Sequence, residues 1–162
     1  MNTTAPLTLA DLDEVDLRLL DLLQHDAART NQALAEAAHV SPATALRRVR
    51  RLVEAGVVAR QVALLGPPFS AAGLTVLAEV SLDAQGAEHL QAFEARAVAE
   101  AAVQQCYRVS PGPDFVLVLW VADMAAWGAL VQRLFTQDAN VRNVKSFFSV
   151  QRAKFETARV LR

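Results

Sequence analysis

The first third of the chain repeats apolar positions with the period of an α-helix. Val15, Leu19 and Leu23 lie one helical turn apart and follow Asp13, a residue type that caps helix starts. A carboxylate in the first turn, such as Asp16, also suits the positive end of the helix dipole. These positions predict a first helix that ends near His25.

Two further helix starts follow. Thr30 or Asn31 can cap a second helix that runs to about residue 38, and Ser41 followed by Pro42 begins a third. Proline at the first helical position loses no hydrogen bond, because that N–H has no partner in a helix. Gly56 is predicted to end the third helix, since glycine readily adopts the left-handed conformation of a C-cap.

The third helix separates apolar from basic side chains. At 100° per residue its apolar positions fall in one arc and most of its basic positions lie opposite, with Arg50 on the flank. The apolar arc is predicted to pack on the first two helices, which turns the basic face to solvent. The apolar positions are Ala45, Leu46, Val49, Leu52 and Val53. The opposite face holds Thr44, Arg47, Arg48 and Arg51.

Charge strengthens this interpretation. The whole chain has 16 basic and 17 acidic residues, a net charge of −1 that argues against nucleic-acid binding. Its distribution argues the reverse: residues 11–40 have two arginines against seven carboxylates, residues 41–61 have five arginines against one, and the remainder balances. Local clustering of arginine is the electrostatic footprint of a nucleic-acid reader. A solvated helix face is the competing interpretation of four arginines alone.

Three short helices with a basic third helix are typical of a winged helix-turn-helix, whose third helix enters the major groove of DNA. The apolar segment 57–65 is expected to form the two-stranded wing. The candidates for contact with base edges are Ser41, Ala43, Thr44, Arg47 and Arg48. The candidates for contact with phosphates are Arg51 and Arg60.

The rest of the chain predicts an α+β fold. Gly66-Pro67-Pro68 indicates a linker, so we expect a DNA-binding domain over residues 1–65 and a second domain over residues 66–162. The second domain alternates as βαββαβ, the ferredoxin-like order. One sheet face carries Leu77 and Phe147 and is expected to lie against a second subunit, with an exposed face on a monomer as the alternative. The predicted strands are 74–82, 103–110, 115–121 and 144–151, and the predicted helices are 87–100 and 125–136.

Several kinds of chemistry are missing from the sequence. Cys106 is the only cysteine, so an intrachain disulfide is excluded and a reducing cytoplasm is favoured. The three histidines have no metal-ligand spacing, and there is no phosphate-binding glycine loop. No apolar run reaches the 18 residues of a membrane helix. We therefore predict no catalytic residue, metal, cofactor or membrane partner.

Three motifs resemble the leucine-responsive/asparagine regulator (Lrp/AsnC) family of bacterial transcription factors, over about residues 11–155. They are Leu12-Asp13-x-x-Asp16-x-x-Leu19-Leu20-x-x-Leu23-Gln24, Ser41-Pro42-x-x-x-x-x-Arg48-Val49-Arg50-Arg51-Leu52-x-x-x-Gly56-Val57-Val58, and the C-terminal landmarks Ala63-Leu64-Leu65, Val109-Ser110, Asp114-Phe115 and Ala153-Lys154. The resemblance implies a transcriptional regulator that binds double-stranded DNA. It also implies homodimers that form through the βαββαβ domain and assemble into octamers, and a small effector such as an amino acid.

The chain departs from the family pattern in three places. His39 stands where the family has glycine in the helix-turn-helix turn, and histidine tolerates a positive φ better than most residues. An arginine of the family signature is displaced to Arg29. The effector loop reads Pro111-Gly112-Pro113-Asp114, in which the prolines remove N–H donors. The effector residues implied by the resemblance are Gly112, Asp114 and Ser146, with Asp114 on an ammonium group; a plain turn role for Asp114 is the alternative.

An enzyme on the same architecture, siroheme decarboxylase, is the alternative function. Cys106-Tyr107-Arg108 is faintly similar to its second strand, but its tryptophan- and proline-rich loop and its basic C-terminal motif are missing. The basic third helix would also have no role in that enzyme.

Overall fold

The computed structural model describes residues 8–66, 69 and 72–161, and these divide into two compact units. The helical unit is formed by residues up to Leu64 together with the chain end from Lys154, and the sheet unit spans residues 65–153. The expected division between residues 65 and 66 lies one residue after the observed one, and it differs in a second respect. It assigned the chain end to the second domain, whereas the structure packs it with the first helices.

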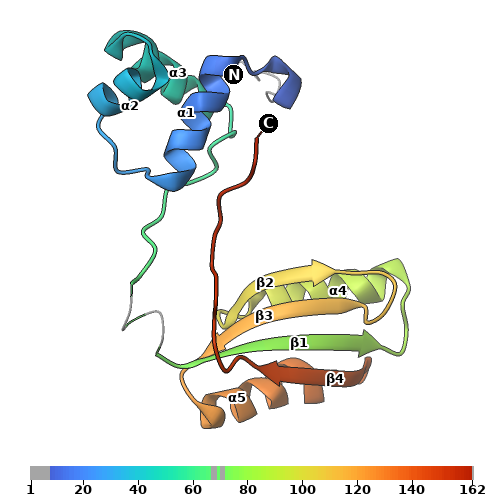
Figure 1. Cartoon of the computed structure of the whole chain (residues 1–162). Coiled ribbons are helices and arrows are strands. Elements are labelled where there is room, and N and C mark those ends of the chain that lie inside the picture. The colour runs from blue at the N-terminus through green and yellow to red at the C-terminus, as the bar shows by residue number, and fades with distance from the viewer. Residues whose placement is uncertain (1–7, 67–68, 70–71, 162) are drawn as a thin grey trace. The chain divides into compact units, whose positions relative to one another are not determined.

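The helical unit holds three helices, as the sequence predicts (Figure 1). They are preceded by a short 3₁₀ turn, η1 (Leu9–Asp11). Each helix begins at its predicted cap: Asp13, Thr30 and Ser41 accept hydrogen bonds from backbone N–H groups of the first turns. The helices are α1 (Glu14–His25), α2 (Asn31–Ala38) and α3 (Pro42–Glu54).

The two predicted left-handed positions are also observed. His39 ends α2 with φ 57° and ψ 47°, so histidine fills the position that the family gives to glycine. Its N–H donates to carbonyls of the last turn of α2, which offsets the strain of a positive φ. Gly56 follows α3 with φ 74°.

The wing is the predicted element that the described residues do not contain. Residues 57–66 form no strand and have no ladder partner in the part of the chain that the structure describes. The physical reason lies in the sequence, which offers no tight turn that would fold this segment back on itself. An isolated two-stranded ribbon is in any case only marginally stable in water unless a third strand or a packed face supports it.

The sheet unit has the predicted βαββαβ order, which confirms the fold class. Its four strands are antiparallel in the order β2-β3-β1-β4. The last strand begins three residues earlier than predicted, and the second helix ends in a π-helical segment. The elements are β1 (Leu74–Leu82), α4 (Ala87–Ala99), β2 (Val103–Arg108), β3 (Phe115–Val121), α5 (Met124–Val131), η3 (Gln132–Thr136) and β4 (Val141–Phe148).

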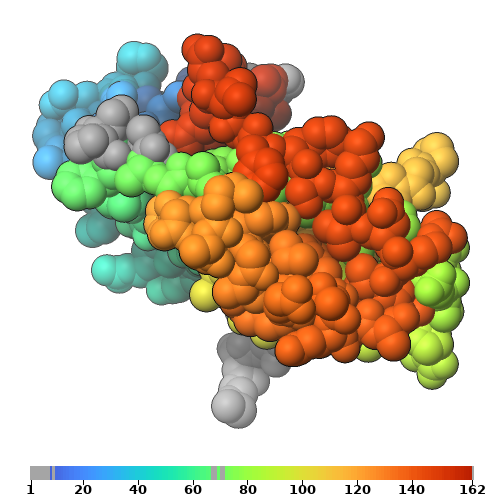
Figure 2. Space-filling model, turned by 90° about the horizontal axis from the view of Figure 1, so that it is seen from below, coloured from blue at the N-terminus to red at the C-terminus, as the bar shows by residue number. Residues whose placement is uncertain are grey.

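Both helices of the sheet unit pack on one face of the sheet. Alternate residues of β1 and β3 are buried in one cluster with Phe93 of α4 and with Trp127 and Leu130 of α5. Figure 2 views α5 and η3 (orange) from outside, beside β4. The other sheet face carries Leu77 and Phe147, which are paired across β1 and β4 and are 41% and 43% exposed. The sheet therefore has one covered and one open face.

No helix among the described residues has the length and apolar character needed to cross a bilayer.

Candidate nucleic-acid interface

A buried carboxylate ties the basic helix to the first helix. Asp16 of α1 is 1% exposed, and its two oxygens accept hydrogen bonds from two arginines of α3. Arg48 Nη1 lies 3.0 Å from Asp16 Oδ1, and Arg51 Nη2 lies 2.5 Å from Asp16 Oδ2. A buried charge is tolerated only when it is paired and hydrogen-bonded, so these arginines offset the desolvation of Asp16.

Asp13 completes this cluster. Both of its oxygens lie within 2.8 Å of Arg48 Nη1, while Oδ1 also caps α1. Hydrogen bonds from the Asp16 N–H and then from Arg48 lower the pKa of Asp13 below its ordinary value. The stabilisation linked to this shift is present above the ordinary carboxylate pKa and is lost as pH falls through the lowered value. The hydrogen bonds that Arg48 donates to the carboxylates of Asp13, the largest cause, and of Asp16 raise the pKa of Arg48.

The exposed side of α3 is turned relative to the predicted one. Arg48, expected to face solvent, has a side chain only 20% exposed, whereas Leu46 and Val53, expected to pack, are about half exposed. Arg50, expected on the flank, is exposed together with Arg47. The helical wheel shows where apolar residues gather, but it cannot show that carboxylates of α1 draw Arg48 toward the interior and pair with Arg51, whose side chain stays 44% exposed.

Arg47 and Arg50 are the cations of α3 that remain available. Neither forms an ion pair with any residue in the ranges 8–66, 69 and 72–161, whereas Arg48 and Arg51 are both paired with Asp16. Sequence reasoning left out Arg50 as a candidate for DNA contact. The signal that could have found it is the pair of acidic residues at the start of α1, spaced to meet arginines on one side of α3.

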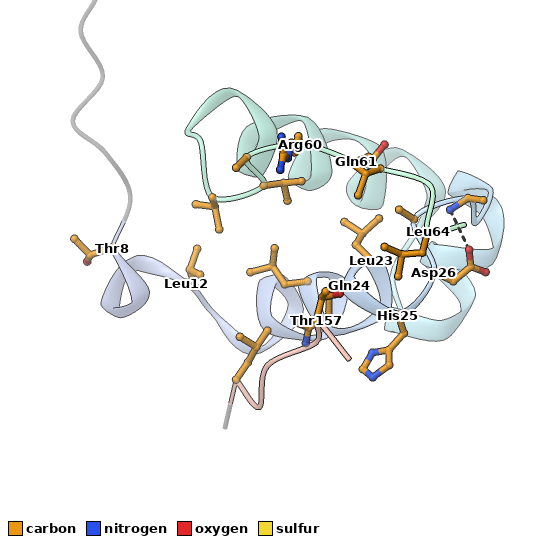
Figure 3. Close-up of a pocket in the computed structure, with 18 residues that line it drawn as sticks. Thr8, Leu12, Leu23, Gln24, His25, Asp26, Arg60, Gln61, Leu64 and Thr157 are labelled. Carbon is orange, nitrogen blue, oxygen red and sulfur yellow. Dashed lines mark hydrogen bonds between the residues drawn. The ribbon is translucent and has the colours of Figure 1, made fainter. Parts of the chain in front are cut away.

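The remaining candidates lie at the start of α3 and beyond its end. Ser41 caps the helix through the N–H of Thr44, and the two hydroxyls are 2.9 Å apart. Ala43 is exposed in the first turn. Arg60 is exposed on the extended segment after α3 and lines a cavity of the helical unit (Figure 3).

Within a single chain, Ser146 lies on another element than the other two effector candidates, Gly112 and Asp114. Asp114 Oδ2 accepts a hydrogen bond of 2.7 Å from the N–H of Leu82 at the end of β1. Ser146 on β4 lies opposite Ala78, four residues earlier on β1, which corresponds to about 13 Å along the strand. Gly112, in the loop between β2 and β3, has a φ of 123° that favours glycine. One Asp114 oxygen therefore already has a structural role, because it accepts the hydrogen bond of the last backbone N–H of β1.

Two family descriptions match the chain in the order that the fold shows. Residues 12–53 match the AsnC-type helix-turn-helix domain, and residues 75–159 match the Lrp/AsnC ligand binding domain. Together, the helix-turn-helix and the βαββαβ unit define a DNA-binding transcriptional regulator. The chain belongs to the Lrp/AsnC family.

The relatives agree with this assignment. An uncharacterized HTH-type transcriptional regulator of Haemophilus influenzae is 32% identical and covers 93% of this chain and 89% of its own. A leucine-responsive regulatory protein of Rhizobium meliloti is 33% identical, over 89% of this chain and 92% of its own length. The crystal structure of a Neisseria meningitidis transcriptional regulator in complex with L-Met superimposes with a TM-score of 0.83 at 29% identity, covering 93% and 97%. Because the family and its relatives are regulators, the enzyme alternative is set aside.

Proposed function

We propose that this regulator reads operator DNA through the exposed side of α3, with Arg47 and Arg50 as its main cations. The observation that carries the proposal is the division of the four arginines: Asp16 binds Arg48 and Arg51, which leaves Arg47 and Arg50 for a ligand. A guanidinium can bind the edge of guanine through two parallel hydrogen bonds, which is the commonest specific contact in the major groove.

The other candidates then take lesser parts in this proposal. Ser41, Ala43 and Thr44 lie in the first turn of α3, the part of a recognition helix that reaches base edges, and Leu46 offers an apolar contact for a thymine methyl. Arg60 remains a candidate for phosphate contact. Arg48 and Arg51 position α3 through Asp16, and the exposed part of Arg51 can still lie near a phosphate.

The test compares single substitutions on operator fragments selected from genomic DNA. Arg47→Ala and Arg50→Ala are each expected to weaken binding by roughly tenfold or more, because each loses a base or phosphate contact. Arg142→Ala, on an exposed position of β4, is the matched control and should bind as the unchanged protein does. Fluorescence anisotropy at fixed salt concentration measures the affinities. Unchanged affinity in both Arg47→Ala and Arg50→Ala would reject this face of α3.

We also propose that the sheet unit senses an amino acid. The match to a ligand-binding domain and the L-Met complex of the Neisseria meningitidis regulator support this. Gly112, Asp114 and Ser146 remain the candidate residues. Asp114 Oδ2 accepts one hydrogen bond from the Leu82 N–H, and the other acceptor positions of the carboxylate can take an ammonium group.

A thermal-shift screen of the twenty amino acids tests effector binding. A ligand present at a hundred times its dissociation constant stabilises a protein by about 2.7 kcal/mol, which for a chain of this size raises the Tm by several degrees. At least one L-amino acid is expected to produce such a shift, and its D-enantiomer serves as the control. Absence of a shift from all twenty would count against amino-acid sensing.

We further propose that the open sheet face is the dimer interface, and that dimers assemble into octamers. Leu77 has Val118 opposite it on β3 and Phe147 opposite it on β4, so three apolar side chains form one row across the face. Contiguous exposed apolar surface of this kind is typical of an interaction site. We also propose that the regulator acts in the cytoplasm, where a bacterial regulator meets its operator DNA.

A further inference from the structure

The last residues of the chain bind to α1. Gln24 Nε2 donates a hydrogen bond of 2.8 Å to the carbonyl of Arg159, and the N–H of Arg159 donates one of 2.8 Å to Gln24 Oε1. One side-chain amide thus satisfies both backbone groups of one residue, as a neighbouring strand would. We call residues 154–161 the C-terminal strap.

The strap passes between two hollows of the helical unit. A cavity of about 770 Å³ lies between α1, the extended segment after α3 and the strap, which contributes Thr157 and Leu161 (Figure 3). A second cavity, of about 700 Å³, is lined by α1 and by most of the strap, and Leu161 lines both. Figure 3 labels Thr157 of the strap and Gln24 of α1 among the lining residues of the first cavity. Hydrogen bonds at Gln24 hold the strap, and its residues 154–157 are exposed, so it can detach without opening the core of the helical unit.

The strap also gives the helices a second connection to the sheet unit, and this one depends on the hydrogen bonds to α1. The chain enters the sheet unit just before β1 and leaves it just after β4. These two points are neighbours in the sheet: Val76 pairs with Phe148, and the N–H of Ser149 donates to the carbonyl of Thr75 at 2.9 Å. Two connections therefore leave the same end of the β1–β4 pair, one to the segment after α3 and one to α1.

We propose that the docked strap is a second tether that restricts the orientation of the helical unit and so sets the spacing of the two recognition helices in a dimer. The inference rests on the proposed DNA binding and dimerisation. A unit held by one linker swivels about it, whereas a unit held at two points keeps fewer orientations. A dimer whose units already lie at the half-site spacing binds the second half-site at higher effective concentration.

Helix α1 carries this restriction to the DNA-reading surface. Near its end it holds the strap through Gln24, and at its start it holds α3 through Asp13 and Asp16. A helix of 12 residues is a rigid rod of about 18 Å, so fixing one end limits the direction of the other. Release of the strap frees the orientation of α3 without changing the side chains that face DNA.

The experiment measures Gln24→Met in the full-length protein on two DNA fragments, one with a single half-site and one with two correctly spaced half-sites. Methionine keeps the length of glutamine and removes both hydrogen bonds. Gln91→Met makes the same change on the exposed surface of α4 and is the control. The expected result for Gln24→Met is unchanged affinity for the single half-site and a loss of about tenfold on the double site. Sedimentation of each protein checks that the oligomer is the same.

A chain that ends after Ala153 is the second variant, and it should show the same selective loss. Hydrogen exchange of the Arg159 amide reports docking directly, and exchange is expected to be faster in Gln24→Met than in Gln91→Met. The inference is overturned if both variants bind the double site as the unchanged protein does, or if they lose affinity equally on both fragments. An unchanged protein that binds neither fragment overturns the proposed DNA binding itself, and this inference with it.

Discussion

Replacing Asp16 with alanine is expected to destabilise the helical unit by about 2–3 kcal/mol, because α3 loses two charge-assisted hydrogen bonds to a buried carboxylate, while Arg48 keeps Asp13 and the exposed Arg51 can be hydrated. Asp16 is 1% exposed and accepts hydrogen bonds from Arg48 and Arg51. The Nε of Arg48 is itself buried and has no hydrogen-bond partner among the described residues, so this guanidinium depends on its carboxylates. Urea unfolding followed by helical circular dichroism measures the loss.

The control is Glu36→Ala on the exposed side of α2, where a change within about 0.5 kcal/mol is expected. The double variant Asp16→Leu/Arg48→Met removes the two least exposed charges of the cluster and leaves Asp13 and Arg51, whose side chains are 54% and 44% exposed and can be hydrated. It should recover most of the stability, because apolar residues of similar volume replace a buried pair at little cost. A loss below 1 kcal/mol for Asp16→Ala would show that the cluster does not hold α1 to α3.

Replacing Phe147 with aspartate is expected to convert the protein to monomers. Phe147 and Leu77 lie side by side on the open sheet face, so a two-fold dimer places their copies close together. A carboxylate there loses its water on association and faces its own copy, which we expect to raise the dimer dissociation constant by at least about 100-fold. Leu77→Asp should act in the same way. Sedimentation equilibrium measures the mass.

Val98→Asp is the matched control, since Val98 is 67% exposed on α4, away from the open face. It should leave the oligomer unchanged. If Phe147→Asp and Leu77→Asp both sediment with the same mass as the unchanged protein, this face is not the interface. The far-ultraviolet circular dichroism of each variant verifies that the sheet unit remains folded.

The helix boundaries could be predicted because their causes are local. Asp13, Thr30 and Ser41 cap with their own side chains, and the N1 proline and the left-handed His39 act within one turn. The prediction of a wing over residues 57–65 was wrong because that segment carries no such local signal. Its residues are apolar and extended, but a strand exists only where a second strand supplies hydrogen bonds. For the same reason β4 begins earlier than the sequence indicated: Val141 pairs with Leu82 at an irregular position of the ladder.

The sequence by itself determined the class of protein. It indicated two short helices, a basic third helix and then a βαββαβ order, because local propensity and the period of hydrophobic positions control where each element forms. Only the tertiary structure decided which arginines are free. A helical wheel treats α3 as a rod in water, whereas the folded unit brings Asp13 and Asp16 against Arg48 and Arg51 across more than thirty residues of sequence. The same is true of the strap, which joins Arg159 to Gln24 over 135 positions. Contacts at such separations are set by packing of the whole unit, which no local pattern encodes.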